Sequence, residues 1–147
     1  MLPELSTNLG YEDVGLEYER IVPGDPARGL VPFYQFKIRN ADGQTVGHIN
    51  FRVGETSHVI NTAGHIGFEI LPNFRGHSYA LKACLALQPF AQQQYGKVVL
   101  TAAPENAHSI RIIEKLGAKF VDEVEVPVDD PAYESGARRK VRYEWAL

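Results

Sequence analysis

Residues 69–80 form the part of this 147-residue sequence whose residue types and spacing most favour chemistry. A short strand-like run ends there, and a helical pattern begins at Gly76. The first amides of a helix have no partner inside the helix, and the helix dipole adds partial positive charge to them. Small side chains at Ser78 and Ala80 let an anion approach the backbone, and Arg75 adds a full charge. The segment therefore predicts a phosphate or pyrophosphate site, with a closely packed strand–helix turn as the alternative.

Other kinds of site have weaker support. The segment lacks the Gly-Lys-Ser/Thr ending of a Walker loop and the Gly-x-Gly-x-x-Gly pattern of a dinucleotide site. The single cysteine, Cys84, excludes an intrachain disulfide and a multi-cysteine zinc site, and its place in an apolar helical stripe predicts a buried, unreactive thiol. No group of His, Asp and Glu residues has metal-ligand spacing, so we predict no bound metal.

Apolar periodicity and turn signals predict the elements that must position this segment. Asp42-Gly43 predicts the turn of a hairpin, Pro89 should kink the first helix or end it early, and Asn106 should cap the second helix. Residues 129–136 should form a polar loop. This order predicts a single α/β (α+β) domain around a mixed, mostly antiparallel sheet flanked by helices. Strands are expected at 15–22, 33–39, 45–53, 65–71, 97–101, 119–126 and 138–146, and helices at 76–95 and 106–116.

Composition bounds the class of protein without selecting a function. Hydrophobic residues make up 44% and charged residues 22%, with a formal net charge of −3, which indicates one folded domain. Domains that hold nucleic acid are usually basic, so we expect no nucleic-acid partner. No run of about 18 apolar residues is present, and residues 1–6 lack the basic and apolar regions of a secretory signal. We therefore expect a cytoplasmic protein without a membrane segment.

Two motifs together resemble the GNAT N-acetyltransferases, which move an acetyl group from acetyl-coenzyme A (acetyl-CoA) to an amine. Residues 75–80 read Arg-Gly-His-Ser-Tyr-Ala, similar to the family's pyrophosphate motif Arg/Gln-x-x-Gly-x-Gly/Ala, with Ser78 in place of the middle glycine. Residues 106–118 are similar to the family's Asn-x-x-Ser/Ala helix that ends in Glu-Lys-x-Gly-Phe. The resemblance implies one N-acetyltransferase-like domain over 1–147, with its acetyl-CoA-binding core at about 64–121.

The resemblance also implies how acetyl-CoA binds. In this fold the strand ending at Ile70 and Leu71 splays away from the strand at 98–101, and the pantetheine arm lies in the gap. The amides of Ile70 and Leu71 would hold that arm and polarise the thioester carbonyl. Asn106 and Ser109 would contact the cofactor from the other side, with a simple N-cap as the alternative for Asn106. The pyrophosphate would lie on the backbone of Arg75, Gly76, His77, Ser78, Tyr79 and Ala80.

The acceptor amine must lose a proton, because alkyl amines are mostly protonated at neutral pH. The resemblance favours Glu69 or His65, on one face of the same strand, as the base, directly or through water. The alternatives are a solvent-facing charge for Glu69 and a structural, hydrogen-bonded histidine for His65. Many relatives carry a tyrosine that protonates the departing thiolate, where this sequence has Ile113. The alternative to an active N-acetyltransferase is therefore a catalytically degenerate CoA-binding sensor or scaffold.

The acceptor side of the family is usually built by two helices between its first and second strands. Only ten residues separate Val22 from Phe33 here, so two helices do not fit. We expect the wall of the acceptor pocket to come from residues 54–64, from residues 129–136 or from a second subunit of a homodimer. The acceptor itself, a small molecule or a peptide amine, is not identified by the sequence.

Overall fold

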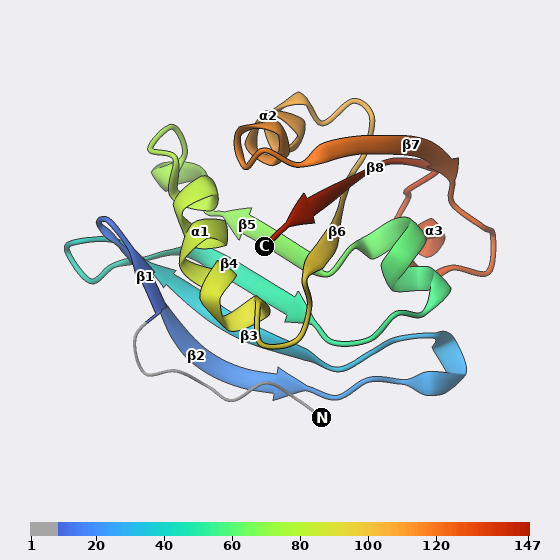
Figure 1. Ribbon diagram of the computed structural model, residues 1–147, viewed down its shortest axis with the longest axis horizontal. Coiled ribbons are helices and arrows are strands. Elements are labelled where there is room, and N and C mark those ends of the chain that lie inside the picture. The colour runs from blue at the N-terminus through green and yellow to red at the C-terminus, as the bar shows by residue number, and fades with distance from the viewer. Residues whose placement is uncertain (1–8) are drawn as a thin grey trace.

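The computed structural model describes residues 9–147, and the segment 1–6 considered above for a secretory signal lies outside this range. Five antiparallel strands form the first sheet in their sequence order (Figure 1). The four expected strands of this part are confirmed to within two residues, and a three-residue strand precedes them. The strands are β1 (Leu9–Tyr11), β2 (Val14–Val22), β3 (Phe33–Arg39), β4 (Thr45–Arg52) and β5 (Ile66–Ile70).

A second sheet holds three antiparallel strands in the order β6-β8-β7. These are β6 (Lys97–Ala102), β7 (Lys119–Glu125) and β8 (Arg139–Ala146), so the last strand of the chain pairs between the two that precede it. The single-domain α+β fold with mostly antiparallel pairing is confirmed, although the strands divide into two sheets rather than one continuous sheet.

The two sheets meet at one point beside β5 and then separate. The His65 amide donates to the Val99 carbonyl over 2.8 Å, and the Val99 amide donates to Nδ1 of the His65 ring over 2.9 Å. Beyond this point no ladder joins β5 to β6, and the two strands diverge toward the C-terminal end of β5 (Figure 1). The splay expected between these strands is therefore present, with His65 at its closed end.

Helix α1 (Tyr79–Ala91) is shorter than the predicted 76–95. It begins later because Ser78 takes a left-handed backbone conformation (φ 60°), and it ends two residues after Pro89. Helix α2 (Ala107–Lys115) agrees with the expected helix, with Asn106 as its N-cap. Two segments read as loops contain short helical turns, namely the π-helical η2 (His58–Ala63) and α3 (Pro131–Glu134).

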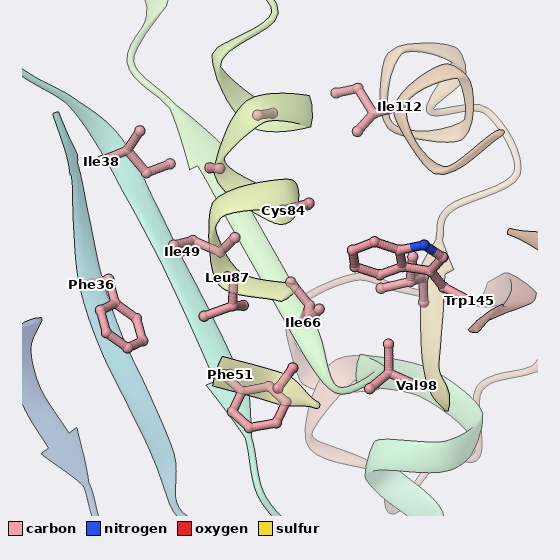
Figure 2. Packing of buried hydrophobic residues seen from close by; sticks show 14 of the residues in the cluster. Phe36, Ile38, Ile49, Phe51, Ile66, Cys84, Leu87, Val98, Ile112 and Trp145 are labelled. Carbon is pink, nitrogen blue, oxygen red and sulfur yellow. The ribbon is translucent and has the colours of Figure 1, made fainter. Parts of the chain in front are cut away.

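The core surrounds α1, which packs against the inner face of the first sheet and against residues of the second sheet and α2, including Val98, Ile112 and Trp145 (Figure 2). Phe90 of α1 makes edge-on contacts with Tyr34, Phe36 and Phe51, at ring-centroid distances of 4.9–5.9 Å. Cys84 is fully buried on the same helix, and burial raises the pKa of its thiol to about 12. The prediction of a buried cysteine is confirmed, and a raised pKa disfavours the thiolate, which is the nucleophilic form.

The connection between β2 and β3 contains only the 3-10 turn η1 (Pro26–Arg28), as the short linker predicted. The face of the first sheet opposite α1 therefore carries no pair of helices from this connection. Polar side chains occupy that face, including Lys37 on β3 and His48, Asn50 and Arg52 on β4. No helix within residues 9–147 is long and apolar enough to cross a membrane.

Candidate active site

The edge of β5 that faces the gap is defined by its hydrogen bonds to β4. The Leu71 amide donates to the Val46 carbonyl over 2.8 Å. Bonding alternates along an antiparallel pair, so the amides of Ile70 and Phe68 point away from β4, toward the gap. The expectation for Ile70 agrees with this geometry. The Leu71 amide is already used within the sheet, and the amide of Phe68 is the neighbouring outward one along β5.

The turn before α1 gathers the predicted anion-binding residues. Gly76 (φ 90°) and Ser78 (φ 60°) both have left-handed backbones, a conformation that favours glycine. This explains why the related motif has glycine at the position of Ser78. The Ser78 side chain makes no capping bond to α1, so its hydroxyl and the first helical amides remain free for a ligand. Arg75 stands beside the turn, with its Nε donating to the Ile70 carbonyl over 3.1 Å.

Two adjoining cavities open at this turn, with volumes of about 270 Å³ and about 540 Å³. Arg75, Gly76 and Ala80 line both cavities, while Ser78 and Tyr79 line the smaller one. The turn is therefore the shared wall of one continuous groove along α1 and α2. Of the six predicted pyrophosphate residues, His77 is the one outside the two linings; its ring lies 5.3 Å from that of Tyr79.

Helix α2 supplies the opposite wall. Asn106 and Ser109 line the larger cavity, where the Asn106 side chain also accepts the Ser109 amide over 3.2 Å as the N-cap. The cap and a cofactor contact are compatible, since capping uses the side-chain oxygen of Asn106 and not its side-chain nitrogen. Three basic residues of α2 line the smaller cavity: His108, which also lines the larger one, and Arg111 and Lys115, which the sequence did not single out. Their spacing of three and four residues places them on one helical face and could have revealed them.

Glu69 is exposed and lines the larger cavity together with Phe68 and Ile70. Its backbone lies opposite His48 of β4, and its carboxylate forms no ion pair within the described residues. A free carboxylate next to the outward amides of β5 is placed to accept a proton from a group bound in the gap.

His65 is separated from Glu69 by the length of β5. Its side chain is 2% exposed, its Nδ1 accepts the Val99 amide, and its ring lies 4.6 Å from that of Tyr95. Burial lowers the pKa of His65 below its ordinary value, with Arg52 adding to the effect and Glu55 opposing it. The structure thus gives His65 the hydrogen-bonded position of a structural residue, which was the alternative to its role as a base.

The strands and helices that form this site lie in a region that matches a known protein family. A sequence model described as the acetyltransferase (GNAT) domain matches residues 17–119, which is more than half of the chain. The chain belongs to the GNAT acetyltransferase family. The match extends from β2 to the start of β7, so it includes the gap between β5 and β6 and both walls of the groove.

Solved structures share the GNAT fold. An acetyltransferase from Agrobacterium tumefaciens strain C58 has a TM-score of 0.66 at 17% identity, over 100% of this chain and 98% of that one. A GNAT acetyltransferase from Bacillus anthracis has a TM-score of 0.59 at 21% identity, over 76% and 65%. The microcin C7 self-immunity acetyltransferase MccE, solved with acetyl-CoA and AMP, has a TM-score of 0.58 at 14% identity, over 78% and 61%.

The GNAT chain therefore spans less than two thirds of the length of the last two proteins. At these identities the likeness shows the fold alone. A search among curated proteins finds no match.

Two features of the GNAT site concern groups that the chain lacks. Ile113, where many relatives carry a tyrosine, is 1% exposed and belongs to the core. No side chain at this position donates a proton to a departing thiolate. Within residues 9–147, no group of three or more His, Cys, Asp or Glu side chains lies close enough to hold a metal ion.

Proposed function

We propose that this protein is an acetyl-CoA-dependent N-acetyltransferase that transfers the acetyl group directly to an amine. The observation that carries the proposal is the gap between β5 and β6, with the outward amides of Phe68 and Ile70 along one edge and the turn at Arg75–Ser78 at its open end. An extended pantetheine arm fits the first feature as an added strand, and a pyrophosphate fits the second. The acetyl-CoA complex of MccE, which shares the fold, supports the same cofactor.

The groove also offers positive charge to the phosphates of coenzyme A. The pyrophosphate would lie on the first amides of α1 beside the hydroxyl of Ser78. Arg111 and Lys115 face the same cavity from α2 and would supply positive charge to the phosphates. The neutral backbone amides of α1 would thus shape the site, and the basic side chains of α2 would add charge to it.

The reaction needs one proton acceptor and one oxyanion site. The nitrogen of the acceptor would attack the thioester carbonyl carbon, a C–N bond would form, and the C–S bond would break to release the thiolate of coenzyme A. Glu69 would accept the proton from the amine, directly or through water. The amides of Phe68 and Ile70 would stabilise the negative charge that develops on the carbonyl oxygen. Water would protonate the thiolate, because Ile113 offers no proton.

The second candidate is a module that binds coenzyme A without turnover, and the replacement of the expected tyrosine by Ile113 favours it. Release of free thiol from acetyl-CoA, followed with a panel of small amines, aminoglycosides and short peptides, separates the two candidates. We expect thiol release that depends on the amine. Binding of acetyl-CoA, seen as a thermal shift, with no release across the panel would instead identify a sensor or scaffold.

We further propose that the enzyme acts in the cytoplasm and that η2, the α3 segment or a second subunit closes the acceptor side. The segment 54–64 is well held for such a wall, since Asp130 beside α3 accepts from Thr62 of η2 over 3.0 Å and lies 2.8 Å from Nδ1 of His58. The expected homodimer would be tested by sedimentation across a range of protein concentrations. A single monomeric species at all concentrations would assign the wall to the chain's own segments.

A further inference from the structure

Arg52 on β4 is a half-buried cation whose hydrogen-bonding capacity is only partly used. Its Nη1 donates to the carbonyls of Ala63 (3.4 Å) and Gly64 (3.2 Å), and its guanidinium lies 5.9 Å from the centre of the Phe33 ring. Within the described residues no carboxylate pairs with it, whereas Arg39 on the same sheet face is paired with Glu17. A guanidinium has five N–H donors, so Nε and Nη2 remain available.

The guanidinium of Arg52 lies against Gly67 of β5. A Cβ atom built on Gly67 would meet only the tip of Arg52, at 3.3 Å from Nη1 and 3.4 Å from Nη2. The charge of Arg52 therefore lies over β5, next to the residue whose amide faces the gap, Phe68. Glu69 is the next residue of β5 on the same face as Gly67, about 7 Å along the strand.

Asn50 stands between these two charges. It pairs directly with Gly67 across the β4–β5 ladder, and its Oδ1 is buried without a hydrogen-bond partner in the structure. A buried acceptor without a partner costs free energy, which a bound N–H group would recover. Along this face an acidic group, a free acceptor and a cation thus follow one another, carried by Glu69, Asn50 and Arg52.

Lys140 of β8 adds a second cation on the other side of the gap. It is half-buried and has no salt bridge within the described residues. Its pKa is lowered, first by burial and then by the charge of Arg52, while Asp130 and Glu105 oppose this shift. The carboxylate of Asp130 is already engaged by His58, Thr62 and the Ala132 amide. Glu105 also acts on Lys140, but no carboxylate forms an ion pair with Arg52 or Lys140 within the described residues.

We propose that the acceptor is a compact amine that carries a carboxylate, with the carboxylate on Arg52 and Lys140 and the nitrogen between Asn50 and Glu69. This inference rests on the proposed function, since it names the substrate class of the same site. The nitrogen of such a molecule would lie beside the outward amide of Phe68, where the acetyl group is expected. A neutral or purely cationic amine would leave both cations unpaired.

The test compares amino acids with their own carboxamides, for example 4-aminobutyrate with 4-aminobutanamide, in wild type and variants. We expect kcat/KM for the carboxylate to exceed that for the carboxamide by about tenfold or more, since hydrogen bonds to charged groups contribute most. Arg52→Gln should remove most of this preference, so that the ratio of the two kcat/KM values falls toward one. Gly67→Ala, which displaces the guanidinium without removing it, should act in the same direction. Arg39→Gln is the control for the change in net charge.

Thermal shift with the same pairs in the absence of turnover keeps the inference separate from the proposed function. Stabilisation of the wild type by the carboxylate but not by the carboxamide, lost in Arg52→Gln, supports the inference even if no amine releases thiol. Equal binding and equal turnover of both members of each pair, or a preference that persists in both Arg52→Gln and Lys140→Gln, overturns it. Turnover of carboxamides alone would support the N-acetyltransferase and reject the anionic acceptor.

Discussion

The two sides of the gap between β5 and β6 are built in different ways. The proposed cofactor side rests mainly on backbone groups of one continuous segment, the outward amides of Phe68 and Ile70 followed by the turn at Ser78, while side chains of α2 add charge. The proposed acceptor side consists of side chains from three segments that are distant in the sequence, with Asn50 and Arg52 on β4, Glu69 on β5 and Lys140 on β8. A backbone site depends on local conformation, whereas a side-chain site depends on how the strands pair.

This difference predicts how each side responds to change. A substitution on the cofactor side should matter where it alters backbone conformation or changes the charge that faces the phosphates. A substitution on the acceptor side should act through the functional group that is removed, with little effect on coenzyme A. The predictions below test this contrast, beginning with the largest expected effect.

Ser78→Asp places a carboxylate in the turn proposed to hold the pyrophosphate. Two like unit charges about 4 Å apart repel by about 4 kcal/mol at an effective dielectric constant near 20, so affinity for CoA should fall by about a thousandfold. Titration calorimetry with CoA measures the change. Ser78→Asn is the matched control, because asparagine has nearly the same shape, carries no charge and tolerates the left-handed backbone. Equal affinities of the two variants would remove the turn from the phosphate site.

Glu69→Gln removes the proposed base and retains its size. We expect kcat/KM to fall by about a hundredfold, at the lower end for general base catalysis, with affinity for acetyl-CoA unchanged. The loss should be greatest at low pH, where the acceptor amine is most protonated. A pH profile of thiol release for wild type and variant measures it. Unchanged turnover would transfer the role of base to water and would show that the acceptor side needs no carboxylate at this position.

Features encoded within one segment could be predicted from the sequence. The strands of the hairpin at 33–53, the cap at Asn106 and the small-residue turn at 75–80 all depend on neighbours within a few positions. The short helical turns η2 and α3 could not be predicted, because four to six residues offer no helical periodicity.

Features encoded by pairing between strands could not be predicted. The sequence predicts outward amides at Ile70 and Leu71, whereas the pairing of β5 with β4 turns those of Phe68 and Ile70 outward. Arg52 and Lys140 are separated by 88 positions in the sequence and carry no motif, so only the fold brings them into one environment. His65 was considered as a base because it shares a face with Glu69, but its contacts with Val99 lie across the gap.

His65 joins the two sides, and its ionisation should therefore affect stability. Burial lowers the pKa of His65 from its ordinary 6.5. Between the folded pKa and 6.5 the unfolded chain holds a proton that the folded chain lacks, so the free energy of unfolding falls as pH decreases below about 6.5. The slope from this one group is at most about 1.4 kcal/mol per pH unit.

His65→Asn tests this link, since its side-chain oxygen can still accept the Val99 amide but cannot titrate. Urea unfolding at several pH values should show a flatter dependence between pH 5 and 6.5 than in wild type. His48→Asn, at an exposed position of β4, is the control for removal of a histidine. If the two variants have the same pH dependence as wild type, His65 does not control the closed end of the gap through its charge.

Ser78→Gly should give the smallest effect and the sharpest test of the cofactor side. A left-handed backbone such as that of Ser78 destabilises the folded state by about 1–2 kcal/mol for a residue other than glycine. Glycine avoids this strain, but the greater entropy of its unfolded chain offsets about 0.5–1 kcal/mol of the gain. The free energy of unfolding should therefore rise by about 0.5–1 kcal/mol in urea. Gly76→Ala, at φ 90° with open space around the added methyl, should lower it by a similar amount.

Affinity for CoA then decides what Ser78 contributes to the phosphate site. If only the backbone holds the pyrophosphate, Ser78→Gly will bind CoA at least as tightly as wild type, because the turn keeps its conformation without strain. If affinity falls, the hydroxyl itself donates to a phosphate, since glycine retains every other feature of the turn. In that case the turn also depends on a side chain, and its contrast with Asn50, Arg52 and Lys140 becomes one of degree.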